Sequence, residues 1–128
     1  MNNLSTKELD LYSNQILEDY DAKNPSQIFK NKVKISNEDA LHIQNKVTEL
    51  RVLRGEEVIG YKIGCISKDT QKKMDLSHPA KGTLWKRELH QNGVELNKKD
   101  YSNPAMEAEF GVIPVSYTHL TLPTSVPV

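Results

Sequence analysis

The sequence predicts an α+β fold in which two helices precede a region of β structure. Through the first part of the 128-residue chain, apolar residues recur every three or four positions, a spacing typical of amphipathic helices. From residue 58 the pattern becomes an alternation rich in β-branched and aromatic residues, which is typical of a strand. We therefore expect an N-terminal helical region over residues 1–57 and the start of a β domain over residues 58–114.

The first helix is expected to begin at Ser5. Ser5 and Glu8 have the spacing of a capping box, and Leu4 and Leu9 are placed as a hydrophobic staple around it. The apolar stripe that starts at Leu9 ends before the Asn-Pro pair at 24–25, where proline disfavours a continuing helix.

The second helix is expected over residues 37–54. Ser36 begins another start signal, and the apolar stripe that follows runs from Ala40 to Leu53. Gly55 stands where a helix commonly ends in the left-handed conformation. Such a stripe could bind a partner, but core packing is its far commoner use.

The β region is expected to open with a strand over residues 58–65. Its alternation places Lys62 on one face with Gly60 and Gly64, while Ile59, Tyr61, Ile63 and Cys65 form the packed face. Because glycine has no side chain, a ligand could approach the Lys62 ammonium closely. The simpler interpretation is that Lys62 only faces solvent, and the pattern alone favours it.

Further elements are indicated by local signals. Ser67 could cap a short helix through about Met74, and residues 77–82 have the composition of a turn. The Asn-Gly pair at 92–93 is typical of a two-residue hairpin, and residues 107–113 alternate as a strand.

Composition excludes several classes of function. Lysine plus arginine (17) balances aspartate plus glutamate (17), so no charge excess favours a nucleic-acid or membrane partner. The chain shows neither a signal peptide nor a membrane-spanning apolar run, and we expect a cytoplasmic protein. The lone Cys65 can form neither an intramolecular disulfide nor a cysteine zinc cluster, and we expect its thiol to be buried. His42, His78 and His90 are interpreted as surface residues, and Trp85 among basic neighbours is thin support for a nucleic-acid site.

Two glutamates are the strongest candidates for a metal site. Glu107 and Glu109 are two residues apart, so on a strand both side chains point to the same side and repel each other. A divalent cation would remove that repulsion, and carboxylate oxygens suit Mg²⁺ or Mn²⁺. An exposed strand face with two glutamates is the alternative, and spacing alone favours it.

Taken together, the segments resemble the 2-keto-4-pentenoate hydratase branch of the fumarylacetoacetate hydrolase superfamily. The resemblance covers roughly Leu4 to Ile113 and lies in "GYKIGCISKDTQKKM", "GTLW", "NGVEL" and "PAMEAEFGVI", in that order. It implies a homo-oligomeric lyase with a mixed β fold that acts on a small 2-keto acid in aromatic catabolism. A 4-oxalocrotonate decarboxylase, an acylpyruvate hydrolase and a non-enzymatic helical module remain alternatives.

The resemblance also implies roles for individual residues. Lys62 becomes catalytic, Glu107 and Glu109 become Mg²⁺ or Mn²⁺ ligands, and Gly64 and Ser67 become substrate-binding residues. A 2-keto acid can chelate the metal through its carboxylate and keto oxygens, after which water adds to the conjugated vinyl group. Lys62 would anchor the substrate or transfer a proton, with its pKa lowered if the cation is close. A third carboxylate ligand is implied further along, but no aspartate or glutamate follows Glu109.

Residues 115–128 have a different character, because they contain no aspartate, glutamate, lysine or arginine. Codons can be chosen for residues 115–124 that reproduce the transposase end sequence and adaptor of sequencing libraries, and that frame reaches a stop after Val128. We interpret residues 115–128 as translated adaptor, so that His119 is no ligand; a natural flexible C-terminus is the alternative. The chain would then be a truncated, poorly folded and inactive part of its parent enzyme, and hydration of a 2-hydroxy-2,4-dienoate by it would overturn this expectation.

Overall fold

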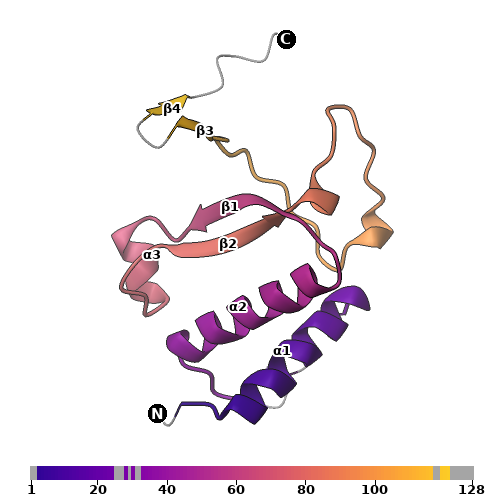
Figure 1. Ribbon diagram of the computed structural model, residues 1–128. Helices are drawn as coiled ribbons and strands as arrows, with labels where there is room; N and C mark the ends of the chain where they lie inside the picture. The colour runs from indigo at the N-terminus through magenta and orange to yellow at the C-terminus, as the bar shows by residue number, and fades with distance from the viewer. Residues whose placement is uncertain (1–2, 25–27, 29, 31–32, 117–118, 122–128) are drawn as a thin grey trace.

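Two helices packed beneath a two-stranded antiparallel sheet form the body of the molecule in a computed structural model (Figure 1). The structure describes residues 3–24, 28, 30, 33–116 and 119–121. The elements in chain order are α1 Thr6–Asp21, α2 Asn37–Leu53, β1 Val58–Gly64, α3 Lys68–Lys73, β2 Ala80–Trp85, two single-turn 3-10 helices at Lys86–Glu88 and Lys98–Asp100, β3 Ile113–Ser116 and β4 His119–Thr121. This arrangement confirms the α+β class. No helix among the described residues is long and apolar enough to cross a membrane.

The first helix begins where its capping signal predicts. The Ser5 hydroxyl accepts a hydrogen bond from the Glu8 amide at 3.4 Å, and the Glu8 carboxylate accepts one from the Ser5 amide at 2.9 Å. The Ser5 side chain also donates to Glu8, and these bonds hold the pKa of the Glu8 carboxyl below 4.5. The Leu4 amide then donates to Asp39 at the start of α2 at 3.2 Å. The beginnings of the two helices are therefore tied together.

The second helix also follows its signals. The Ser36 hydroxyl accepts a hydrogen bond from the Asp39 amide at 3.1 Å, which satisfies one of the donors exposed at a helix start. The helix ends at Leu53, one residue before the predicted end, and Gly55 follows with φ +92°. A positive φ favours glycine, which explains why the helix stops there.

The sheet contains one strand that the sequence predicts and one that it does not. β1 pairs antiparallel with β2, with Lys62 opposite Gly82 and a bulge between Val58 and Gly60. The predicted turn over residues 77–82 is wrong in its second half, because residues 80–82 belong to β2. The backbone amides and carbonyls of β1 need a partner strand, and this need outweighs the turn propensity of the sequence.

One face of the β1–β2 sheet lies toward α2. Thr83 and Trp85 lie on the face toward α2, and Tyr61, opposite Thr83, shares it. The Gln44 side chain on α2 donates to the Lys81 carbonyl on β2 at 2.8 Å. The contacts of α2 with the sheet are thus to β2, and the predicted packed face of β1 is wrong: Tyr61 stays 58% exposed.

Cys65 also departs from its prediction. It lies just beyond β1 with φ +53°, and it is partly exposed rather than buried. The backbone turns here, because the Gln71 amide group on α3 donates to the Cys65 carbonyl at 2.9 Å.

Two β predictions farther along the chain are wrong. The turn at Asn92 exists, since Gly93 has φ +81° and the Val94 amide donates to the Gln91 carbonyl, but no strands flank it. Residues 107–112 form no strand either, and β3 begins only at Ile113. A strand persists only when another backbone accepts its hydrogen bonds. Among the described residues, β1 and β2 pair with each other and β3 pairs with β4.

A cluster of charged and aromatic side chains joins α2 to the sheet. The Arg51 guanidinium donates to Glu56 at 2.6 and 3.0 Å and to Glu88 at 2.7 Å. Its Cζ lies 4.0 Å from the ring centroid of Trp85 and 4.7 Å from that of Tyr20. We call these five residues the Arg51 cluster. Trp85 is only 4% exposed, so it belongs to the core and not to a nucleic-acid surface.

Candidate functional site

Three of the residues singled out from the sequence meet on the sheet face that points away from α2. The Lys62 Nζ lies 2.9 Å from Glu107 Oε2 and 2.9 Å from Glu109 Oε1. We call these three residues the Lys62 site. Lys62 and Glu107 are 45 positions apart in sequence, so the chain must cross back over the sheet to form this contact. The orange segment that passes above β1 and β2 in Figure 1 makes this crossing.

Glycines leave the surroundings of Lys62 open. By register, Lys62 shares its face with Gly60, Gly64 and Gly82. A Cβ atom added at Gly64 or Gly82 would meet no heavy atom within 4 Å, and one added at Gly60 would meet only the end of Leu84 at 3.8 Å. The face beside the ammonium is therefore open at these three positions.

The two glutamates point to the same side, as predicted, although the segment that carries them is not a strand. An extended backbone directs residues i and i+2 to one side whether or not it is paired in a sheet. Both carboxylates are largely exposed, at 68% for Glu107 and 57% for Glu109. Lys62 does face solvent, with its side chain 46% exposed, and its ammonium also contacts both carboxylates.

The charge state of Lys62 follows from these contacts. The hydrogen bond to Glu109, and next the one to Glu107, raise the pKa of Lys62 above 10.5. A lowered pKa was expected if a cation lies nearby, and two anions alone produce the opposite shift. Lys62 is thus a charged hydrogen-bond donor in this structure rather than a base.

Gly64 and Ser67 lie close by along the chain. Gly64 ends β1 opposite Ala80. The Ser67 hydroxyl caps α3, since it accepts from the Thr70 amide at 3.1 Å and donates to the Thr70 hydroxyl at 2.8 Å. Its hydrogen-bonding capacity is therefore largely used by the cap.

The donor atoms of the Lys62 site suit a hard divalent cation. Glu107 and Glu109 offer carboxylate oxygens, which Mg²⁺ and Mn²⁺ prefer, and such ions commonly keep waters and substrate atoms as further ligands. Within the described part of the chain, no three histidine, cysteine, aspartate or glutamate side chains are grouped so that they could hold a metal. The pair is therefore a two-carboxylate site. In this structure the pair contacts the Lys62 ammonium.

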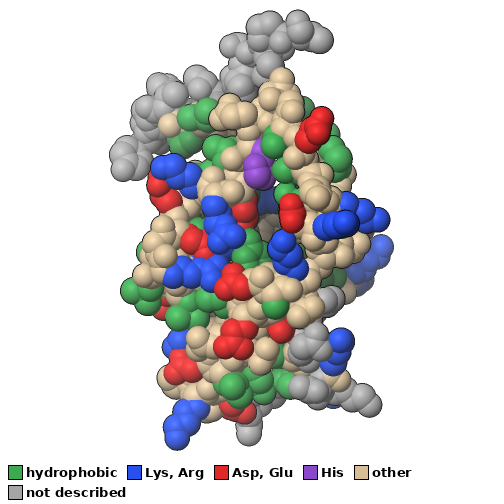
Figure 2. Space-filling view, turned by 90° about the vertical axis from the view of Figure 1, so that its right-hand side faces the viewer, with side chains coloured by type: hydrophobic (Ala, Val, Ile, Leu, Met, Phe, Trp, Pro, Cys, Tyr) green, Lys and Arg blue, Asp and Glu red, His purple; other side chains and the backbone are tan. Residues whose placement is uncertain are grey.

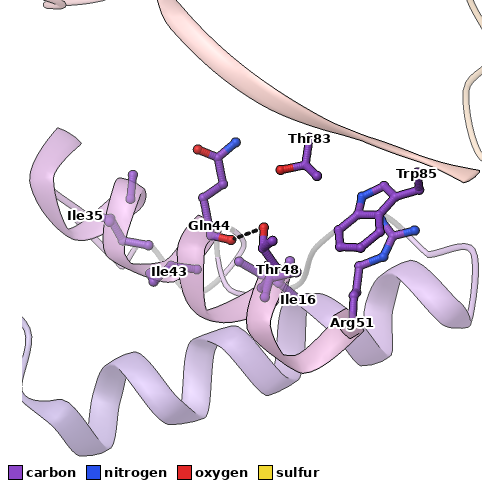
Figure 3. Close-up of a pocket in the computed structure, with 10 residues that line it drawn as sticks. Ile16, Ile35, Ile43, Gln44, Thr48, Arg51, Thr83 and Trp85 are labelled. Carbon is purple, nitrogen blue, oxygen red and sulfur yellow. Dashed lines mark hydrogen bonds between the residues drawn. The ribbon is translucent and has the colours of Figure 1, made fainter. Parts of the chain in front are cut away.

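A separate hollow lies on the other face of the sheet. It has a volume of about 450 Å³ and opens between α2, α1 and β2 (Figure 3). Gln44, Thr83 and Trp85 point into it, and the Thr48 hydroxyl donates to the Gln44 carbonyl at 3.0 Å. The rest of its lining is mainly aliphatic: Ile16, Ile35, Ala40, Ile43 and Val47. The hollow is incompletely filled core space, and it does not reach Lys62.

The face drawn in Figure 2 carries no field of one sign. Lysine and arginine side chains alternate with aspartate and glutamate on the face drawn in Figure 2. His42, His78 and His90 are exposed, which confirms their surface placement. No protein-family model matches this chain, and no curated protein matches it either.

The Arg51 cluster is the feature that sequence reasoning missed. Arg51 follows Ile43 and Val47 at steps of four, so it occupies a position on the apolar face of α2. A charged residue at such a position is a signal for a buried pair. The sequence does not name the partner, because Glu88 is 37 positions away.

Proposed function

We propose that this chain carries part of the active site of a divalent-metal hydratase, which adds water to a 2-hydroxy-2,4-dienoate (2-keto-4-pentenoate). The observation that supports the proposal best is the convergence of Lys62, Glu107 and Glu109 on the glycine-lined face of β1 and β2. The resemblance to the fumarylacetoacetate hydrolase superfamily, and with it the mixed β fold, belongs to the same proposal.

Each residue has a distinct role in this reaction. Glu107 and Glu109 would hold Mg²⁺ or Mn²⁺, which supplies the Lewis acidity that polarises a chelating 2-keto acid. The Lys62 ammonium would donate hydrogen bonds to the substrate carboxylate, because a charged donor matches that anion. Gly64 leaves open the space through which a planar conjugated chain can lie along the sheet.

Metal binding tests the first part of the proposal. Mn²⁺ affinity of the 128-residue chain can be measured from the free-ion signal in electron paramagnetic resonance. Glu107→Gln and Glu109→Gln should each weaken binding by about tenfold or more, since each removes one of two anionic ligands. Glu95→Gln is the matched control, because Glu95 is also exposed but lies outside the Lys62 site. Equal Mn²⁺ affinity in all four proteins would contradict the metal site.

The reaction itself is tested in a relative whose chain continues beyond the segment equivalent to Ile113. Replacement of the glutamate equivalent to Glu107 by glutamine should remove hydration of the dienoate while the fold, followed by circular dichroism, stays intact. Unchanged turnover in that variant would contradict the proposed hydratase function.

A further inference from the structure

We propose that Lys62 and the two glutamates form an electrostatic clasp that holds residues 103–112 against the sheet, and that a divalent cation opens this clasp. We call residues 103–112 the strap. The clasp stands on the geometry of the described residues, whereas its opening by a cation rests on the proposed function.

The strap gains little from apolar burial. Every residue from 101 to 114 is exposed, with Met106 at 100% and Phe110 at 96%. Residues 103–112 also lie outside both two-stranded sheets. Among the described residues, the hydrogen bonds and ion pairs of the strap are those with Lys62. A segment with neither buried apolar surface nor strand pairing depends on its few polar contacts.

The start of the strap is anchored at a separate point. Lys23, just after α1, pairs with Asp100 at 3.2 Å, and its carbonyl accepts a hydrogen bond from Ser102 at 2.5 Å. The strap therefore begins at a fixed point near the helices. Lys62 then fixes its far half over the opposite face of the sheet.

A divalent cation and the ammonium compete for the same oxygen atoms. Both carboxylates direct an oxygen to the Lys62 Nζ at 2.9 Å, and an ion bound between them would face that positive charge at close range. The ammonium must therefore leave when the cation binds. Because only the strap carries the two ligands, it then loses its tie to β1, and the freed Lys62 can pair with an anionic ligand.

Backbone order of the strap tests the clasp without any metal. We expect ¹⁵N NMR order parameters of residues 105–112 to fall in Lys62→Met, from values typical of ordered backbone toward values below about 0.6. Lys86→Met is the matched control, since it removes another exposed ion pair, with Glu57 at 2.6 Å, far along the chain from the strap. In the unaltered chain, about 1 M salt should have the same effect as Lys62→Met, because screening then acts within about 3 Å. Unchanged order parameters in both tests would overturn the clasp.

Metal affinity tests the competition. Lys62→Met should bind Mn²⁺ roughly 3- to 30-fold more tightly than the unaltered chain, whereas Lys62→Arg, which keeps the charge, should not. Mg²⁺ should lower the strap order parameters of the unaltered chain, as Lys62→Met does. If the unaltered chain and Lys62→Met bind Mn²⁺ equally and Glu107→Gln binds it weakly, displacement is wrong and the metal site stands. If none of them binds Mn²⁺, the metal site and the displacement both fail, and the order parameters of Lys62→Met and of the unaltered chain in high salt decide whether the clasp exists.

Discussion

Replacement of Arg51 by methionine should destabilise the chain more than any exposed substitution. The Arg51 side chain is 8% exposed and that of Glu56 is 9%, so their ion pair is largely removed from water. Breaking a buried pair from one side costs about 3–5 kcal/mol, because the remaining charge stays buried. The stacked rings of Trp85 and Tyr20 add about 0.5–2 kcal/mol. Arg54 also pairs with Glu56 and moderates the loss, so we expect about 3–4 kcal/mol.

Urea unfolding followed by tryptophan fluorescence measures this loss directly. Trp85 is the one tryptophan of the sequence and belongs to the Arg51 cluster, so its fluorescence reports on the surroundings of residue 51. Lys46→Met is the control: Lys46, also on α2, pairs with Asp10 on α1, but its side chain is 35% exposed and that of Asp10 is 48%, and such pairs contribute about 0–1 kcal/mol.

A small effect would refute this reasoning. If Arg51→Met lowers the free energy of unfolding by less than about 1 kcal/mol, like Lys46→Met, the cluster contributes no more than a surface pair. A domain of this size commonly has about 5–15 kcal/mol in total. The expected loss is therefore large enough to shift the urea midpoint well outside experimental error.

Three other predictions concern the ends of helices, acid and the C-terminal residues. Ser5→Ala should cost about 0.5–2 kcal/mol in urea unfolding, because the α1 capping box is lost, whereas Ser77→Ala, outside any cap, should cost less. Burial raises the pKa of Glu56, but hydrogen bonds from Arg51 and Arg54 outweigh it and hold that pKa below 4.5. The stabilisation by the ionised Glu56 carboxylate is therefore complete above the pKa that Glu56 has in the unfolded chain, and it is lost as pH falls through the lower pKa of the folded chain. The urea concentration at the unfolding midpoint should decrease once pH falls below about 4.5, and it should decrease less in Glu56→Gln. Removal of residues 115–128 should change the free energy of unfolding by less than about 0.5 kcal/mol, since β3 pairs with β4 and not with β1 or β2; a larger loss would show that the tail packs on the body.

The sequence predicts elements whose signals are local. Ser5, Ser36 and Ser67 each cap the helix that they were expected to cap, because a capping bond spans only three residues. Gly55 ends α2 for an equally local reason, its positive φ. The alternation from Val58 similarly predicts β1 to within one residue.

Contacts between distant segments are predicted poorly, because they depend on which partner is available. β2 was missed, since proline and glycine near Ala80 indicate a turn while pairing with β1 decides the outcome. The strand predicted over residues 107–113 does not form over residues 107–112. Its alternating pattern is typical of a strand, but no described strand pairs with these residues. Lys62 and Glu107 were linked by the resemblance alone, and spacing gave no reason for their contact.

The Arg51 cluster and the Lys62 site differ in how far their ion pairs are exposed to solvent. In the Arg51 cluster, the side chains of Arg51 and Glu56 are more than nine-tenths covered, so their ion pair is much less open to ions from solvent. At the Lys62 site, Lys62 is 46% and Glu107 is 68% exposed, so an incoming ion can replace either partner. A pair that maintains the fold must resist exchange, whereas the proposed binding of a metal and an anionic substrate requires a pair that permits it. Salt should therefore loosen the strap well before it affects α2, and the reverse order would mean that burial does not separate the two roles.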